Sequence, residues 1–524
     1  MKVSMNMLDR MISWISPRAG AHRMFARISM AAASGRITNV RNAAGGREGT
    51  MGNWHPRRLH RHEEQLSFFK AMERAESLLA NDGHAVSAID ALALNIVGVG
   101  LKPQSYPDCA TLGISEDEGA AFAESMERAW KFWSEEADAG AVLSFEDIQY
   151  QAMRSMLTTG EILHLSAWRE DGNRLFGFCI QPLHPARLRT PTDKTGDHSI
   201  QNGIELGRYG EPLAYWIATP GDDQPLNGLS SSDFIRVERE KAGRIICLHR
   251  YRSLMPEAIR GTSILAPAMK QFRDLADYVD YELVGALIAA SFTVFIEDAN
   301  PSFPGGGFGG ASATVPPDYT QQIQPGTVVL GQAGHKPHII SSNRPGSMFD
   351  QFYERILRAA AASTGQPYES VAKDFSKTNY SSARAALLEV WKLHALYQDW
   401  FVRSVLTPYY RMVLEEAWLR GMLDIPAKAK APDSDPFTLR AWCNCVWTRP
   451  PRGQIDPVKE READNLALAN FTETHSAICH ARGLDFETVA RTRQREKRLL
   501  EKLGLAESPS PVPAAKDDAH ADEQ

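Results

Sequence analysis

The sequence has no C-x-x-C pair among its 524 residues, and this absence excludes two common kinds of small scaffold. A zinc ribbon needs closely paired thiolates, and a disulfide framework needs an ordered set of cysteines in a secreted chain. The sequence therefore predicts neither, and a reducing compartment fits it. The Cys-Asn-Cys pair at Cys443 and Cys445 alternates like a strand and is interpreted as core packing. The other cysteines are Cys109, Cys179, Cys247 and Cys479.

The sequence also lacks an apolar run long enough to cross a bilayer. Its longest one, Leu283 to Ile296, has 14 residues between Glu282 and Glu297, whereas a spanning helix needs about 20. In the N-terminal "MLDRMISWISPRAG", charged Asp9 and Arg10 interrupt the continuous apolar region that a signal peptide needs, so we predict no export signal. No membrane partner is expected, and the run 283–296 is interpreted as core or subunit interface.

Positive charge is not in excess over the whole chain. The net charge is −6 and the pI is near 6.2, which argues against a protein that holds nucleic acid over its entire surface. Residues 1–62, however, carry eleven Lys and Arg against two acidic residues, so the remaining chain carries −15. We predict a flexible basic arm over 1–62, and the alternative interpretation is a dedicated contact with an anionic partner.

Sequence motifs for common catalytic sites are missing as well. There is no G-x-x-x-x-G-K-[ST] loop and no G-x-S-x-G elbow, and the glycines of "PGGGFGG" at 304–310 are interpreted as flexible chain. A metal site at "HPRRLHRHEE" is disfavoured because three arginines would repel a cation. We therefore expect no enzyme, no cofactor and no metal. The cluster remains the only basis for an enzyme hypothesis; its members are His55, His60, His62, Glu63 and Glu64.

The first half of the chain has the pattern of an α+β body. Apolar residues recur at helical spacing from Leu66 to Val97, and Gly98 and Gly100 end that segment. Ser144 and Asp147 have capping-box spacing at the start of another helix. Four β-rich stretches follow, with a hairpin turn predicted at "RYGEP"; they are "EILHLSAWR", "LFGFCIQPL", "GIELGRYGEPLAYWI" and "RIICLHRY".

The second half has long helical patterns around a small β segment. A helix of roughly 40 Å is predicted to begin at Ser263, at 1.5 Å per residue. Residues 297–345 have glycine, proline and short strand signals, and helix returns over 347–364. Six tryptophans at helical or strand-facing positions are interpreted as core rather than as base-stacking platforms; they are Trp130, Trp133, Trp391, Trp400, Trp418 and Trp442.

A polar "NYSSAR" segment precedes the last long helix. Ser381 or Ser382 is predicted to cap that helix, and Asn379 to accommodate the turn before it. The helix should continue past Pro408 to about Gly421 as one bent element. Further helices are predicted from Val458 to about Leu505 with a break at Gly483, and a disordered tail over 506–524.

Several stretches, taken in order, resemble the portal proteins of tailed bacteriophages, of the lambda type. They cover roughly residues 7–500, and the ordered set is more specific than any single piece. The segments are "ISPRAG", "ALALNIVGVGLKP", "FEDIQYQAMRSMLTTGEIL", "GIELGRYGEPLAYWI", "IRGTSILAPAMKQFRDLADYVDYELVGALIAASF", "GQPYESVAKDFSKTNYSSARAALLEVWK" and "IDPVKEREADNLALA".

The resemblance implies a portal-type α+β subunit with a wing, long stem helices, a small β-containing clip, a kinked long helix and a helical crown. It divides the chain as follows: N-terminal arm 1–62, wing 63–262, stem helix one 263–292, clip 293–345, stem helix two 346–364, tunnel loop 365–380, long kinked helix and wing return 381–456, crown-like helices 457–505 and tail 506–524.

The resemblance also implies a function. Portal subunits form a ring of twelve at one capsid vertex, through which double-stranded DNA passes without sequence preference during packaging and ejection. Implied partners are the terminase large subunit, head-completion or tail-joining proteins, and capsid and scaffold proteins. The implied location is the virion, with assembly in the host cytoplasm. The chain itself would not be an enzyme.

On this reading the DNA-facing residues are expected in the tunnel loop and the stem. The tunnel-loop residues are Lys373, Lys377 and Asn379, and the stem residues are Lys270 and Arg273. The bland alternative is that the lysines only solubilise a loop. Two other hypotheses for the whole chain stay open: a nucleic-acid-processing enzyme, and a tail or scaffold interaction protein without a channel.

Overall fold

The computed structural model describes residues 61–219, 229–291, 294–297, 328–331, 349–377, 379–451, 453 and 457–505. The residues from Phe68 onward form one compact unit. The predictions for the basic arm, for most of 293–345 and for the tail 506–524 lie outside the described residues. Within the described ranges, no helix is both long and apolar enough to span a bilayer.

The chain enters the described region through two helices, α3 (Arg61–Asn81) and α4 (Gly83–Ile96). The expected helical pattern is present, but it breaks at Asp82, whose carboxylate accepts a hydrogen bond from the Ala85 amide at 2.7 Å. Asp82 thereby starts a new helix, as an N-cap side chain does. The predicted stop is confirmed, since Gly98 and Gly100 both have positive φ.

Helices α6 (Glu116–Glu135) and α7 (Phe145–Thr159) form the helical side of the α+β body, with α5 (Cys109–Leu112) before them. The predicted capping box at α7 is confirmed, because the Ser144 and Asp147 side chains each accept from the other residue's amide. An aromatic cluster fills the core beside these helices. Trp130, Trp133 and Trp442 are buried there, as expected, whereas Trp391, Trp400 and Trp418 are half-buried.

Antiparallel strands form the rest of the α+β body. One sheet has the order β10-β2-β3, from β2 (Glu161–Trp168), β3 (Phe178–Leu183) and β10 (Cys247–Tyr251). A second sheet has the order β4-β5-β6-β7, where the predicted hairpin pairs Ile204 with Tyr215. Its strands are β4 (Ile200–Gln201), β5 (Ile204–Leu206), β6 (Pro212–Ala218) and β7 (Phe234–Glu238).

Short elements complete this region. The stretch "RIICLHRY" is not one strand, because β8 (Glu240–Lys241) pairs with β9 (Arg244–Ile245) before β10 begins. β1 (Lys102–Ser105) pairs with β13 (Cys445–Thr448), which brings the C-terminal part of the chain back to the α+β body. The 3-10 turns are η3 (Pro185–Arg187), η4 (Thr192–Lys194) and η5 (Ser231–Asp233).

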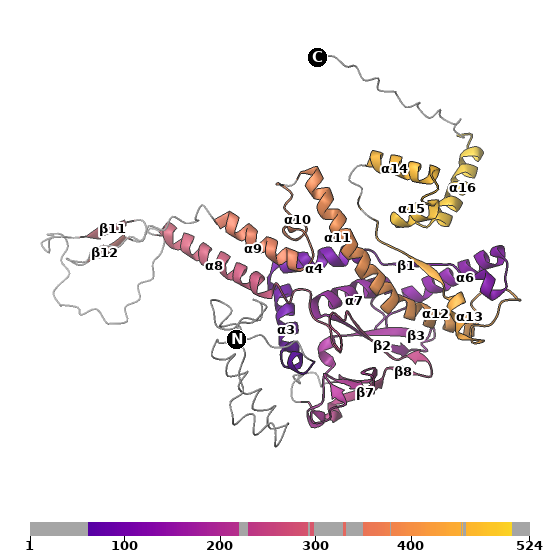
Figure 1. Cartoon of the computed structure of the whole chain (residues 1–524), viewed down its shortest axis with the longest axis horizontal. Coiled ribbons are helices and arrows are strands. Elements are labelled where there is room, and N and C mark those ends of the chain that lie inside the picture. Colours follow the sequence, from indigo (N-terminus) through magenta and orange to yellow (C-terminus); the bar gives the residue numbers. More distant parts are fainter. Residues whose placement is uncertain are drawn as a thin grey trace, which may run out of the picture. The chain divides into compact units, whose positions relative to one another are not determined.

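Two antiparallel helices, α8 (Met269–Ser291) and α9 (Phe349–Ser363), pack side by side (Figure 1). The prediction that the first of them begins at Ser263 is wrong. The Ile264 amide donates to the Leu157 carbonyl at 3.0 Å, so this part of the chain is tied to α7. Pro267 also lacks an amide hydrogen. Between the helices, β11 (Val294–Glu297) pairs in parallel with β12 (Val328–Gly331), which confirms a small β element there.

One bent element follows the short helix α10 (Tyr368–Ala372). It consists of α11 (Tyr380–Phe401), the π-helical turn η6 (Val402–Leu406) and α12 (Thr407–Leu419), without a break. The prediction of a single element through Pro408 is confirmed. Pro408 has no N–H for the Ser404 carbonyl, and that carbonyl instead accepts a hydrogen bond from Arg250 Nε at 2.9 Å.

The C-terminal region is helical apart from β13. Its helices are α13 (Pro436–Trp442), α14 (Pro457–Ala469), α15 (His475–Ala481) and α16 (Phe486–Lys502). The predicted break at Gly483 is confirmed by its φ of +71°. The strand predicted through Cys443 is wrong, because Cys443 ends α13 and only Cys445 lies in β13. Both thiols still face the core, and burial raises the pKa of each to about 12.

Candidate channel loop and stem

The loop from Thr364 to Asn379 connects α9 to α11 and is anchored where it starts. Gly365 has φ of +74°, and a side chain there would collide with Leu393. The buried Gln366 amide donates to the Ala88 carbonyl of α4 at 2.9 Å. Val371, in α10, is also buried. The first half of the loop is therefore part of the core, and only its second half is presented to solvent.

The exposed half of the loop contains the three predicted tunnel residues. Lys373 ends α10 with φ of +57° and is exposed, and Phe375 beside it is 64% exposed. The Asp374 carboxylate accepts from the Ser376 amide at 3.0 Å, which forms a local turn. Left-handed backbone is uncommon for lysine, so Lys373 marks a sharp reversal rather than the middle of a helix.

Lys377 is held by a carboxylate on α9. Its Nζ lies 2.8 Å from Glu354 Oε2, and Arg358 Nη2 lies 2.7 Å from the other oxygen. The hydrogen bonds from Lys377 and Arg358 hold the pKa of Glu354 below its usual value. The Arg358 guanidinium also covers the Tyr368 ring, 4.6 Å from its centroid. We call Glu354, Arg358 and Lys377 the loop latch.

Asn379 is the N-cap of α11, in place of the predicted Ser381 or Ser382. Its Oδ1 accepts from the Ser382 amide at 2.8 Å, and the Ser382 hydroxyl donates to Asn379 Oδ1 at 2.9 Å. Asn379 is the cap because its own backbone is extended just before the first turn, whereas Ser381 and Ser382 already lie within α11. The side-chain oxygen of Asn379 is thus engaged within the chain.

The predicted stem residues lie at the start of α8. Lys270 pairs with Asp274, and Arg273 Nη2 lies 2.8 Å from Asp277 Oδ1, both one helical turn ahead. These pairs are exposed. In the part of the chain that the structure describes, neither cation contacts Lys373, Lys377 or Asn379. The stem and loop residues are therefore two separate groups within one subunit.

The lead into α8 is fixed by a buried ion pair that sequence reasoning missed. Arg260 Nε and Nη2 each lie 2.6 Å from one oxygen of Glu161, and the Gly261 amide donates to Glu161 Oε1 at 2.9 Å. Gly160 and Gly261 are in backbone contact, so a side chain at either would displace the other segment. The only trace of this ion pair in the sequence is a charged residue beside a glycine, in "TGE" at 159–161 and in "RGT" at 260–262. The two charged residues are 99 positions apart, so nothing local connects them.

The outer part of α8 presents apolar side chains on the single subunit. Tyr281 is 72% exposed, Leu283 59% and Val284 51%. The helix carries two basic and four acidic residues, so its formal charge is −2. Single exposed apolar residues are normal, but three within four positions of one helix indicate a surface that another protein surface covers.

The enzyme hypothesis gains no geometric support in the described part of the chain. Residues 55–60 of the His/Glu cluster lie outside it, and His62, Glu63 and Glu64 lie in the first turn of α3. In the described ranges, no three His, Cys, Asp or Glu side chains are grouped as metal ligands would be. The six cysteines are all unpaired.

The described fold thus joins two long antiparallel helices to a mixed body of helices and small sheets, and comparison with known proteins identifies its family. Residues 47–398 match the model of the phage portal protein, lambda family. The chain is 24% identical to portal protein B of Escherichia phage lambda over 498 residues, covering 90% of this chain and 92% of that one. It is 23% identical to the portal protein of Escherichia phage N15, covering 88% and 90%.

Two solved structures are similar at a lower level. They are the neck of an empty GTA particle computed with C6 symmetry (TM-score 0.39, 15% identity, 84% of this chain and 97% of that one) and the virion of a native gene transfer agent particle (TM-score 0.37, 14% identity, 83% and 94%). Because the family model covers more than half of the chain, the protein belongs to the lambda family of phage portal proteins. Members of that family are structural components of phage particles, as the resemblance noted in the sequence implied.

Proposed function

We propose that this portal protein assembles into a ring of twelve subunits at one capsid vertex and conducts double-stranded DNA during packaging and ejection. The observation that carries the proposal is the arrangement of α8, α9 and the following loop. Two antiparallel helices lead into a loop whose base is buried at Gln366 and Val371 and whose exposed end carries Lys373 and Lys377. Such a loop holds its two lysines at the surface on a base that is fixed in the core.

Ring formation is supported by the apolar surface of α8. Tyr281, Leu283 and Val284 lose contact with water if the α8–α9 pairs of neighbouring subunits pack together, and apolar burial is the main driving force of stable association. In a closed ring each lining side chain is repeated by the symmetry, so one cation per subunit becomes a ring of cations.

We assign the DNA-facing role to Lys373 and Lys377 in the loop, with Asn379 at its end and Lys270 and Arg273 as further contacts in the stem. Every phosphate that a basic side chain neutralises adds affinity, which would slow DNA that must slide. The internal carboxylate partners of Lys270, Arg273 and Lys377 reduce that attraction. The contacts are then weak and independent of base sequence.

The remaining assignments complete the proposal. We assign the chain to wing, stem, clip, tunnel loop, long helix and crown with the bounds given above, except that the first stem helix begins at Met269. The clip docks the terminase large subunit and later the head-completion proteins, while other surfaces meet capsid and scaffold proteins. ATP hydrolysis belongs to the terminase, and the portal itself catalyses no reaction. It resides in the virion after assembly in the host cytoplasm.

The test combines imaging with a DNA-retention assay. Negative-stain class averages of the purified chain should show a closed ring with a central channel wide enough for duplex DNA. Particles filled with DNA should lose it faster when their portal carries Lys373→Ala and Lys377→Ala. The matched control is Lys392→Ala, which removes an exposed lysine of α11 that pairs with Glu389. A chain that stays monomeric under every condition refutes the ring, and unchanged packaging and retention refute the lysine contacts.

A further inference from the structure

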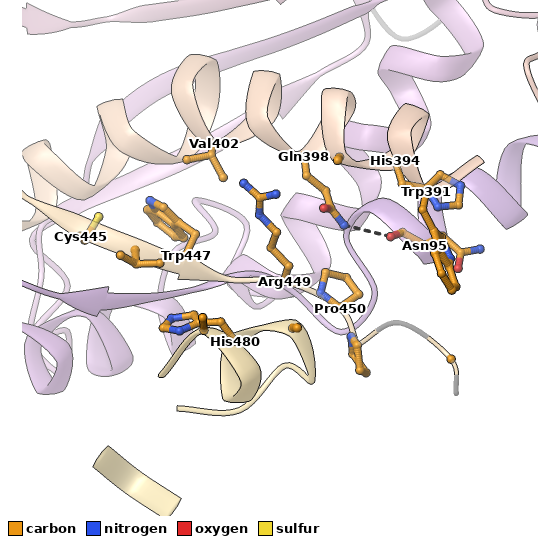
Figure 2. A pocket seen from close by; sticks show the side chains of 16 residues that line it. Asn95, Trp391, His394, Gln398, Val402, Cys445, Trp447, Arg449, Pro450 and His480 are labelled. Carbon is orange, nitrogen blue, oxygen red and sulfur yellow. Dashed lines mark hydrogen bonds between the residues drawn. The ribbon is translucent and has the colours of Figure 1, made fainter. Parts of the chain in front are cut away.

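A cavity of about 570 Å³ lies between α11, the strand β13 with the residues after it, and α15. Figure 2 shows its lining, with Trp391, His394 and Gln398 on the helix above β13 and His480 on α15. The volume is in the range of small-molecule sites in proteins. The cavity is remote from the stem and loop residues discussed above, none of which lines it.

Positive charge enters this cavity without a carboxylate to balance it. The Arg449 side chain extends from the segment after β13 toward α11 and ends between Val402 and Gln398 (Figure 2). No Asp or Glu is among the described residues that line the cavity, and Arg449 forms no ion pair in the described part of the chain. Burial lowers the pKa of the neighbouring His394 to about 4, so that imidazole is neutral at pH 7.

Two buried nitrogen atoms in the lining have no nitrogen or oxygen partner among the described residues. Trp447 is 5% exposed, and its indole Nε1–H meets no such acceptor. The Cys445 thiol lies close enough for this N–H to lower its pKa, against the larger effect of burial, but sulfur is a weak acceptor. His480 Nδ1 donates to the Ser476 carbonyl at 2.8 Å, so Nε2 of the neutral imidazole is an acceptor; it is buried and unpartnered but does not itself call for an anion.

Unsatisfied buried donors cost free energy, and native proteins usually supply a partner for them. The buried donor here is the Trp447 indole N–H, and the exposed Arg449 side chain adds guanidinium N–H groups to the same cavity, so the partner must be an acceptor. It should also be negatively charged, because the guanidinium carries the only permanent charge among the described lining residues. Oxyanions meet both requirements, and guanidinium binds carboxylate and phosphate through paired hydrogen bonds.

We propose that this cavity is an oxyanion-binding site in which the Arg449 guanidinium and the Trp447 indole N–H receive a carboxylate or phosphate group. That group has two possible sources with the same chemistry. It is either a free small anion or an acidic side chain of a second copy of this chain, and the second source rests on the ring proposed above. Either one joins α15 to β13 and α11, and so fixes the C-terminal helices on the wing.

The experiment measures binding of inorganic phosphate and of glutarate to the full chain, by calorimetry at constant ionic strength and at concentrations below assembly. Wild type should bind one ion per chain. Arg449→Gln should weaken binding about tenfold or more, because a charge-assisted hydrogen bond is worth about the free energy of one to two decades in affinity. Trp447→Phe should weaken it less, and Arg449→Lys should retain part of it.

Arg440→Gln is the matched control, since it removes an exposed arginine of α13 that does not line the cavity. Equal losses in the Arg449 and Arg440 variants would indicate a general charge effect and overturn the proposal. Binding to both the dilute chain and the assembled ring identifies a free anion as the occupant. Binding to the dilute chain alone identifies an acidic side chain of the neighbouring copy.

One result remains, in which neither ion binds. If the occupant is an acidic side chain of a second copy, the Arg449→Gln variant should then form rings less completely than the Arg440→Gln variant. Equal ring formation by the two variants would refute the proposed site. If wild type forms no ring but binds an ion in an Arg449-dependent way, the ring proposal fails and the site stands. Thermal unfolding of each variant shows whether the fold is intact, which is expected because Arg449 is exposed.

Discussion

Both carboxylate oxygens of Glu161 accept hydrogen bonds from Arg260, each at 2.6 Å, although 99 residues separate the two in the sequence. Glu161 is fully buried and Arg260 is 6% exposed. Arg260 also donates to the Leu188 and Asn202 carbonyls, so one guanidinium joins β2, the second sheet region and the lead into α8. The pair fixes the place where the chain leaves the α+β body and leads into α8.

Replacing Arg260 with Gln should lower the free energy of unfolding by about 3–5 kcal/mol, because it leaves the buried Glu161 carboxylate without its cation. Urea denaturation checks this value. Asp424→Asn is the control, since it breaks the exposed pair with Arg128 at 3.2 Å and should cost less than about 1 kcal/mol. Similar losses in both variants would contradict a special role for the buried pair.

The same pair should produce a loss of stability in acid. Burial raises the pKa of Glu161, but Arg260 and His249 lower it by more than burial raises it. The net result is a folded pKa of about 2, compared with 4.5 in the unfolded chain. The stabilisation from ionised Glu161 is therefore complete above about pH 4.5 and is lost as the pH falls toward 2. The stability difference between wild type and Glu161→Gln, measured by urea denaturation at each pH, should be constant above pH 4.5 and shrink below it. A difference that does not change in acid would contradict this.

Glu127 should have the opposite dependence. Burial raises its pKa to about 7, with help from Asp485, Glu487 and Glu124, although its carboxylate accepts from the Ser105 amide. A raised folded pKa means that its contribution is present below about pH 4.5 and is lost as the pH rises through 7.

Glu127→Gln, which mimics the protonated form, should therefore match wild type near pH 4 and melt at a higher temperature near pH 8. Thermal unfolding followed by circular dichroism gives both values. Glu135→Gln, an exposed position on the same helix, serves as the control. A melting temperature for Glu127→Gln that equals wild type at pH 8 would rule out this explanation.

Opening the loop latch should strengthen DNA binding. Glu354→Gln removes the carboxylate that holds Lys377 and Arg358, so both cations become available to phosphates. In the assembled ring, the slope of log affinity against log salt should steepen by about 0.9 for each phosphate newly contacted per bound DNA. Glu389→Gln, which frees the exposed Lys392 of α11, is the matched control. An unchanged slope in the Glu354 variant means that Lys377 does not meet DNA.

Removing the Asn379 cap should loosen the start of α11. Asn379→Ala should cost about 0.5–2 kcal/mol, whereas Asn379→Asp keeps an acceptor for the Ser382 amide and should cost less. Hydrogen exchange at the Ser382 amide gives the local effect directly. Faster exchange in the Ala variant alone would confirm the cap, and equal exchange in both variants would contradict it.

Much of the local structure was predictable because its causes lie within a few residues. The Ser144/Asp147 capping box, the Ile204–Tyr215 hairpin and the glycine stops after α4 each depend on contacts at short sequence separation. The Asp82 cap, which also arises from neighbouring residues, was missed because it interrupts an otherwise continuous apolar period. The late start of α8 was missed for a different reason, since a hydrogen bond from Ile264 to Leu157 holds the preceding residues out of the helix.

The sequence by itself determined the α+β class, the long helices, the single helical element through Pro408 and the family resemblance, because periodicity and ordered motifs are linear properties. Only the tertiary structure decided which charges meet. Glu354 neutralises Lys377, Glu161 receives Arg260, and Arg449 stands in a cavity without a carboxylate. Those relationships depend on distance in space, and a Coulomb or hydrogen-bond partner many residues away leaves no periodic trace in the chain.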